Sequence, residues 1–183
     1  APRAMASSGV MSVAGGLRGS GIQAGLAGVV PLDDSGALDV GVDLDALPLA
    51  LLDRIAGQLG LRGRISGTGR VTGQLADPTA AFDLTGQGVS LTAIEDLGIR
   101  PLTVALRGRA NADQLQVISG RANSPGGLRV QIAGRMPYSG PGLDLEVNAS
   151  SPLSLINQSL AETATQLGGQ ATLATGVSGS LTA

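Results

Sequence analysis

Cysteine and histidine are both absent from this 183-residue chain, and so are lysine and tryptophan. Without cysteine the chain can form no disulfide and offers no thiol nucleophile. Without histidine it lacks the imidazole that most zinc sites and many general bases use. No serine stands beside an obvious base, and no group of acidic residues has the spacing of a metal site. We therefore expect no catalytic residue, no cofactor and no metal, and we expect that the protein is not an enzyme.

Aromatic residues and clustered positive charge are also scarce. Phe82 and Tyr138 are the only aromatic residues, and fourteen acids against twelve arginines leave a net charge of −2. The arginines are scattered along the chain. A nucleic-acid surface needs a basic face, and a single-stranded site also needs aromatic side chains on which bases stack. These properties exclude nucleic acid as the expected partner.

Long apolar runs are missing, although 43% of the residues are hydrophobic. The best candidate, "AGLAGVVPL", is broken by Pro31 and falls far short of the roughly eighteen residues that a membrane-spanning helix needs. The hydrophobic residues are almost all Leu, Val, Ile and Ala. Such a composition makes apolar surface without the specific contacts that aromatic rings provide.

What the sequence does contain is a repeated alternation of apolar and polar residues. "LRVQIAG" (128–134) and "LDLEV" (143–147) place aliphatic residues on one face of a strand and charged or amide residues on the other. Between such segments lie turn sequences, including "NSPGG" and "YSGPG". The pattern predicts a mainly β protein whose sheet has one uniformly aliphatic face.

Two segments depart from the strand pattern. "LPLALLDRIAGQLG", near 48–59, and "SPLSLINQSLAETATQLGG", near 152–167, carry apolar residues at helical spacing, and each has a proline where a first helical turn would begin. We predict a short amphipathic helix in each. Such helices could close one end of a curled sheet or cover its apolar face.

The chain also resembles itself at long range. "LRGRISGTGRVTGQL" from Leu61 aligns without a gap with "LGGQATLATGVSGSL" from Leu167, about 106 residues later. The same spacing relates "LAGVVP" (26–31) to "IAGRMP" (132–137). We interpret 1–60 as the end of one unit, 61–166 as a nearly complete β unit and 167–183 as the start of the next. All belong to one continuous domain, which we expect to be a segment of a longer chain.

Other features have simpler explanations than chemistry. The glycines of "GTGRVTG" (67–73) lack the spacing, the lysine and the following helix of a phosphate-binding loop, so we interpret them as bends in a strand. The acid pairs Asp33-Asp34 and Glu95-Asp96 are interpreted as solvated loop charges. The arginines of "RGR" at 62–64 and 107–109 are interpreted as charges that protect strand edges, with contact to anionic headgroups as the alternative.

The stretch "GRISGTGRVTGQLADPTAAFDLTGQGVSL", followed by "LTVALRGRANADQLQV" and "LRVQIAGRM", resembles the β-rich repeats of the TamB family of AsmA-like envelope proteins. The shared pattern is glycine, valine, glycine and leucine at alternate positions, then a proline. The resemblance implies a long curled sheet, a β-taco or open half-barrel with an apolar concave face. It also implies a periplasmic segment of a protein anchored in the inner membrane of a Gram-negative bacterium and partnered with the outer-membrane barrel protein TamA.

For function, the resemblance implies passage of phospholipid between the two membranes and support of outer-membrane biogenesis and protein assembly, with nascent outer-membrane proteins as a further partner. Acyl chains suit an aliphatic face that short helices cannot cover. The alternative is a structural β-solenoid segment of a surface adhesin or autotransporter. The expected groove residues are the aliphatic and aromatic residues of the alternating segments: Val71, Leu75, Phe82, Leu84, Leu102, Val104, Leu106, Leu115, Val117, Leu128, Val130, Ile132, Leu143, Leu145 and Val147.

Overall fold

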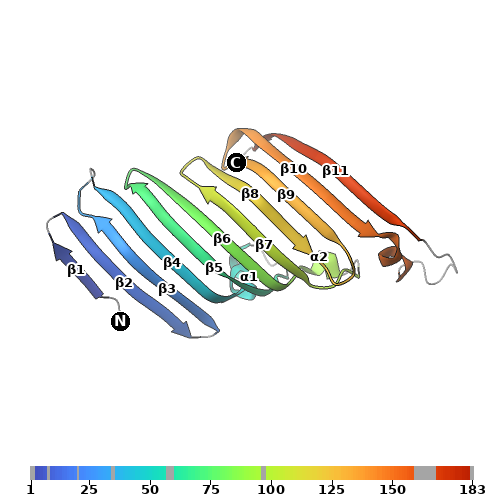
Figure 1. Ribbon diagram of the computed structural model, residues 1–183, viewed down its shortest axis with the longest axis horizontal. Coiled ribbons are helices and arrows are strands. Elements are labelled where there is room, and N and C mark those ends of the chain that lie inside the picture. Colours follow the sequence, from blue (N-terminus) through green and yellow to red (C-terminus); the bar gives the residue numbers. More distant parts are fainter. Residues whose placement is uncertain are drawn as a thin grey trace.

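The computed structural model contains a single antiparallel sheet that curls without closing (Figure 1). It describes residues 3–7, 9–19, 21–33, 36–56, 60–95, 98–158 and 168–181. The sheet has eleven strands in sequence order, so each strand pairs only with its neighbours along the chain. The predicted fold class, a mainly β, curled open sheet with an apolar concave face, is confirmed.

The strands are long and regular. They are β1 (Arg3–Ser7), β2 (Val10–Gly19), β3 (Ile22–Pro31), β4 (Ala37–Pro48), β5 (Arg62–Gln74), β6 (Asp77–Ser90), β7 (Leu102–Ala110), β8 (Gln114–Asn123), β9 (Arg129–Pro137), β10 (Gly140–Pro152) and β11 (Gln170–Leu181). Short turns join most of them. Between β8 and β9, for example, Ser124 donates its N–H to Leu128 O and its Oγ–H to Arg100 O, while its Oγ accepts from Gly126 N.

Helical structure is limited to three short pieces among the described residues. The predicted helix near 48–59 is present as α1 (Leu49–Ala56), whose continuation at 57–59 lies outside the described residues. The second predicted helix, near 152–167, is a 3₁₀ helix, η1 (Leu153–Gln158), as far as it is described; 159–167 lie outside the described residues. A third piece, α2 (Thr92–Glu95), was not expected from the sequence.

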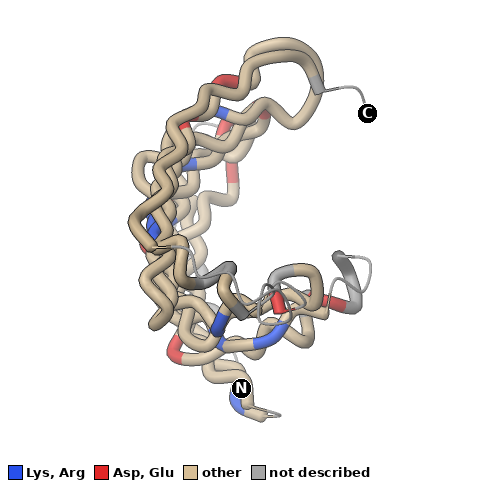
Figure 2. Tube along the Cα trace, turned by 90° about the vertical axis from the view of Figure 1, so that its right-hand side faces the viewer, with Lys and Arg blue, Asp and Glu red and all other residues tan. Residues whose placement is uncertain are grey.

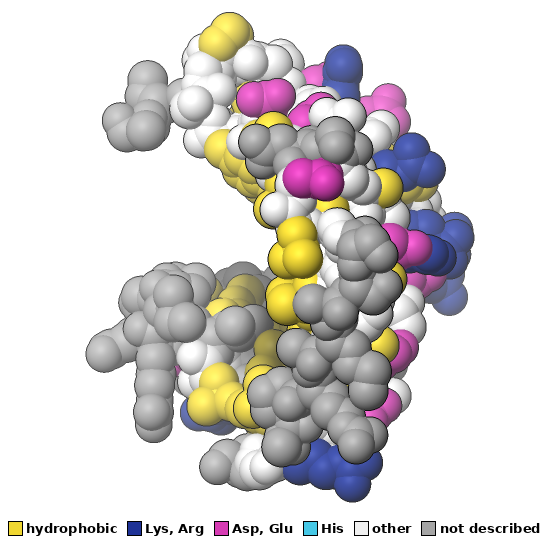
Figure 3. Space-filling model, turned by 90° about the vertical axis from the view of Figure 1, so that its left-hand side faces the viewer, with side chains coloured by type: hydrophobic (Ala, Val, Ile, Leu, Met, Phe, Trp, Pro, Cys, Tyr) yellow, Lys and Arg dark blue, Asp and Glu magenta, His cyan; other side chains and the backbone are white. Residues whose placement is uncertain are grey.

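The two faces of the sheet differ in chemistry. In the end-on views the chain follows an open C (Figure 2), and hydrophobic side chains line the inside of this C while charged side chains lie on the outside (Figure 3). We call these the concave and convex faces. Along β10 the half-buried Leu143, Leu145 and Val147 alternate with the exposed Asp144 and Glu146. The alternation read from the sequence therefore separates the two faces.

Large residues and glycines alternate along one cross-strand line of the concave face, which we call the central row. From β4 to β11 its members, joined in register, are Val42, Gly69, Phe82, Gly108, Val117, Gly134, Leu145 and Val177. The Phe82 ring occupies the space above Gly108, where a Cβ would lie 2.5 Å from Phe82 Cζ. Side chains converge inside a curl, so a glycine beside each large residue gives it room.

Gly134 shows a stronger requirement. Its φ of +139° lies in the region that favours glycine, and a Cβ there would overlap the backbone carbonyl oxygen of Asp144 on β10. Gly28 makes the same approach to the carbonyl oxygen of Asp39 on β4. These glycines let adjacent strands come closer than side-chain-bearing residues would allow.

The segments that match in sequence occupy matching places in the sheet. Leu38, Val40 and Val42 of β4 pair with Gly73, Val71 and Gly69 of β5. Leu143, Leu145 and Val147 of β10 pair in the same way with Gly179, Val177 and Thr175 of β11. The turn glycines recur too, since a Cβ on Gly21 would lie 3.4 Å from Pro48 Cγ and one on Gly127 would lie 2.8 Å from Pro152 Cγ. Strands β3 to β5 and β9 to β11 are therefore related in register as well as in sequence.

Because glycine is needed inside the curl, a methyl group added at one of these positions should lower the stability of the protein. A Cβ on Gly120 of β8 would overlap Ile132 Cγ2 of β9. We expect Gly120→Ala to lower the free energy of unfolding by about 1–3 kcal/mol, as overpacking does, measured from urea denaturation curves. Gly176→Ala is the matched control, because a Cβ there meets nothing within 4 Å. In a double-mutant cycle, Ile132→Ala should relieve part of the Gly120→Ala loss; strictly additive losses would contradict the packing account.

Candidate functional site

The concave face forms an apolar groove that no second layer of described residues covers. Among the described aliphatic and aromatic side chains only Leu49 and Val117 are buried, with 5% and 8% of their surface exposed. Most of the others on this face are half-buried, and Leu173 and Val177 of β11 are 57% and 44% exposed. The described residues therefore hold an extended aliphatic surface and almost no closed core.

The expected groove residues lie where the alternation placed them, with two exceptions. Those in the strands share the concave face, because each is paired in register with, or alternates along its strand with, a member of the central row. They are Val71, Phe82, Leu84, Leu102, Val104, Leu106, Leu115, Val117, Val130, Ile132, Leu143, Leu145 and Val147. All of these except the buried Val117 are half-buried.

Leu75 and Leu128 are the exceptions, because neither lies in a strand. Leu75 belongs to the turn between β5 and β6 and is 46% exposed. Pairing of these strands ends at Gln74 and Asp77, so the alternation stops before it reaches Leu75. Leu128 precedes β9 and accepts a hydrogen bond from Ser124 N through its carbonyl oxygen. Neither residue is paired in register with another strand, so their place on the groove face stays a prediction.

Further residues of the same face lie in β4, for which no groove residue was named. Val40, Val42 and Leu44 pair with Val71, Gly69 and Gly67 of β5 and so point to the concave face. The signal that could have found them was the alternation in "ALDVGVDLD" (37–45), which is as regular as that of β10. The groove therefore extends beyond the 61–166 unit.

The helical pieces lie at one end of the strands (Figure 1). The principal contacts of α1 are with β4 and β5, and its Leu49 is buried there. Asp53 Oδ1 accepts a hydrogen bond of 3.0 Å from Leu61 N, which fixes the return of the chain into β5. The helical pieces thus lie at one end of the groove, and no described residues cover the rest of its length.

Glu95 holds α2 against the sheet. Its carboxylate accepts a hydrogen bond of 2.7 Å from Ser90 Oγ–H, and its Oε2 lies 3.5 Å from Arg62 Nη1. Ser90 is 2% exposed, so this contact partly buries the acid that pairs with it. The expectation of a solvated loop charge is therefore wrong for Glu95, because the turn after β6 folds back onto the strand end. Asp96 lies outside the described residues.

Ion pairs between neighbouring strands occupy the convex face. Arg70 of β5 donates from Nε to Asp39 Oδ1 of β4 at 2.7 Å, and Arg107 of β7 donates from Nε to Asp83 Oδ2 of β6 at 2.9 Å. The side chains in both pairs are about half exposed, so each pair contributes little to stability. Their effect is on register, because a shifted strand would lose its partner.

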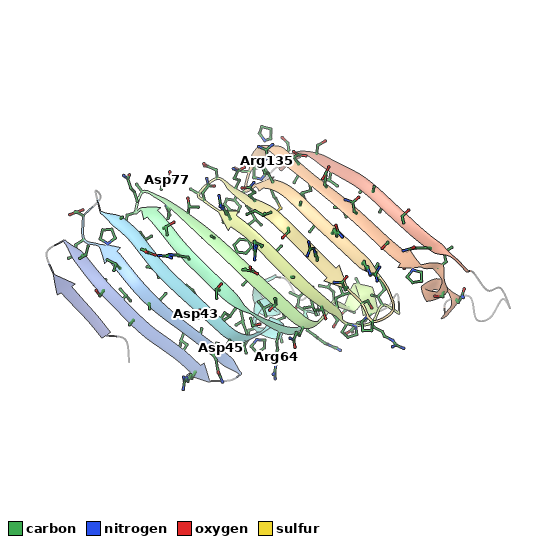
Figure 4. The ribbon with its side chains drawn as sticks, viewed as in Figure 1. Asp43, Asp45, Arg64, Asp77 and Arg135 are labelled. Atoms are coloured by element: carbon green, nitrogen blue, oxygen red, sulfur yellow. The ribbon has the colours of Figure 1, made fainter. Side chains whose placement is uncertain are left out.

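Charged side chains also mark the two ends of the strands. Figure 4 shows Asp43, Asp45 and Arg64 toward one end of β4 and β5, and Asp77 and Arg135 toward the other end of the sheet. Arg64 is exposed, and Arg135 lies 3.6 Å from Asp144 of β10. Asp43 and Asp45 alternate along β4 with Val42 and Leu44, and Arg135 follows Gly134, so these charges belong to the convex face.

The described residues contain no group of three or more acidic, cysteine or histidine residues placed to hold a metal ion. An open depression of about 640 Å³ on the convex face is lined by Asp39, Arg70, Asp83 and Arg107, whose charges already pair with one another. None of the described helices has the length and apolarity to cross a membrane. What the arrangement offers chemically is apolar surface.

Comparison with known proteins adds no relative: no protein-family model, no curated protein and no solved structure matches this chain.

The ion pair on the convex face predicts a pH effect. The Arg70 guanidinium, by hydrogen bonding and charge, holds the pKa of the Asp39 carboxyl below its ordinary value of 3.8. Stability from this pair is therefore present above pH 3.8 and is lost as the pH falls through the lower pKa of the folded state. We expect carboxyl NMR titration to show a higher Asp39 pKa in Arg70→Gln than in the wild type. Equal midpoints would show that the pair does not persist in solution.

Proposed function

We propose that this chain binds phospholipid acyl chains along its concave face and serves as a segment of a conduit for lipid. The observation that carries the proposal is the uncovered aliphatic face of a sheet that curls without closing. Large contiguous apolar surfaces outside a membrane mark binding sites. The curl shapes this surface into a trough, which suits a long, narrow and wholly apolar ligand better than a flat partner.

The chemistry of the trough suits movement along it. Burial of each methylene contributes about 0.8 kcal/mol wherever along an aliphatic surface it occurs. Phe82 is the single aromatic residue of the described part of this face, and its two neighbours in the central row are the glycines Gly69 and Gly108. Because most of this face is aliphatic, an acyl chain would be shielded from water and still free to slide.

The wider setting follows from the resemblance to the TamB family. On this basis we propose a periplasmic location, with the parent protein anchored in the inner membrane, TamA as a partner of that parent, and a role in outer-membrane biogenesis that includes nascent outer-membrane proteins. The alternative, a structural solenoid segment, predicts short coils whose aliphatic faces pack on one another. The observed meander leaves that face open, which favours the conduit.

Photo-crosslinking tests the proposal directly. A photoreactive amino acid is placed in turn at Arg129, Val130, Gln131 and Ile132 of β9, and the protein is irradiated with phospholipid vesicles. We expect lipid adducts at Val130 and Ile132, which face the groove, and none at Arg129 and Gln131, which face outward. Adducts at none of the four positions in folded protein would reject the conduit, and equal adducts at all four would indicate nonspecific adsorption.

Charge inside the trough should block the ligand without unfolding the protein. We expect Val130→Asp to weaken binding of a phospholipid that carries a fluorescent acyl chain by about ten-fold or more, since a carboxylate beside hydrocarbon must be desolvated. Gln131→Asp, on the opposite face of the same strand, is the matched control and should bind like the wild type.

Leu145→Asp and Asn148→Asp repeat the comparison on β10. Circular dichroism and urea denaturation of every variant separate the two explanations. A cooperative loss of structure in Val130→Asp and Leu145→Asp alone would mean that these residues belong to a closed core, contrary to the proposal.

A further inference from the structure

Strand β11 forms an edge of the sheet with which no described strand other than β10 pairs. It pairs with β10 over its whole length. All of its residues from Gln170 to Ser180 are exposed. Its sequence, "QATLATGVSGSL", contains no charged residue and no proline, the two devices that most often keep sheet edges from pairing. A long, uncharged edge of this kind is a template for another strand.

The internal repeat indicates what kind of strand fits there. β11 matches β5 in sequence, and the pairing of Leu143 to Ala149 with β11 reproduces that of Leu38 to Leu44 with β5, position by position. Gly63 and Gly169, at the start of the two strands, have φ angles of +109° and +102°. On its second edge β5 is completed by β6. The edge of β11 that corresponds to it, on the side away from β10, pairs with no described strand.

We propose that the free edge of β11 binds an extended polypeptide strand with the pattern of β6, supplied from outside these 183 residues and running antiparallel to β11. Its register follows from the β5–β6 pair, in which Val71 faces Ala80, Gly69 faces Phe82 and Gly73 faces Pro78. In the bound strand the residues equivalent to Ala80, Phe82 and Pro78 therefore face Val177, Thr175 and Gly179. The inference concerns the sheet edge and does not depend on lipid binding.

The surroundings of the equivalent positions support this pairing. A Cβ added at Gly73 would lie closest to atoms of β6, 2.7 Å from Asp77 O and 3.6 Å from Pro78 Cα, whereas one added at Gly179 would meet nothing within 4 Å. Val71 is half-buried, while its counterpart Val177 is 44% exposed. An added strand would supply the neighbours that β5 has and β11 lacks, and it would continue the concave face by one strand.

The absence of cysteine allows a clean test by disulfide formation. The full chain carrying Val177→Cys is mixed, in a glutathione redox buffer whose oxidised form is the oxidant, with synthetic peptides of residues 77–90 that carry one cysteine each, at position 79, 80 or 81. We expect the peptide with Ala80→Cys to form the disulfide about ten-fold faster than those with Thr79→Cys or Ala81→Cys, because adjacent residues point to opposite faces. The pair Thr175→Cys and Phe82→Cys should react with the same preference.

Two controls separate edge pairing from other modes of binding. The chain carrying Val71→Cys should form little adduct, since β5 is already paired on both edges; reaction equal to that of Val177→Cys would indicate binding to the face of the groove. A peptide of the same composition with each apolar residue exchanged for its polar neighbour should bind at least about ten-fold more weakly. Equal rates at positions 79, 80 and 81, or a Val177→Cys homodimer that forms in preference to the peptide adduct, would overturn the proposal.

Discussion

A sheet curls only when the side chains on its inner face have room to converge, and this constraint shapes the whole molecule. The central row meets it by placing a glycine beside nearly every large residue, so that Phe82 lies over Gly108 and Val117 lies between Gly108 and Gly134. The side chains of the outer face diverge, which leaves room for pairs of arginine and aspartate. The glycines of the central row therefore serve the curvature of the sheet rather than its flexibility.

The same curvature explains why the described residues form almost no core in the usual sense. An open curl brings the inner side chains close enough to be half-buried by their neighbours, yet it places no second layer over them. Backbone ladders and cross-strand contacts must then supply most of the stability. The aliphatic face that would be a core in a sandwich is left as a surface, and its function follows from what it can take up.

Alternation of period two predicted strands with two different faces, because it is a local signal. The open curl was expected from the resemblance to the TamB family, and the order of the strands was not predicted. The sequence predicted α1 but not α2, whose position depends on Glu95 reaching Ser90 after a turn. Alternation also named Leu75 and Leu128, which lie in a turn and in a loop outside the strands. Register could be assigned only from the structure, because bulges such as the one at Ile118 and Ser119 shift the pairing in ways that residue type does not reveal.

Sequence-order pairing has a consequence for how such a chain is built. Each strand of the sheet needs only the strand before it, so no distant segment has to return and close the structure. The chain therefore loses loop-closure entropy in small steps, one hairpin at a time. A chain of this design can fold progressively as it emerges from a ribosome or a membrane pore, and its length can change by whole hairpins during evolution without disturbing the strands already in place.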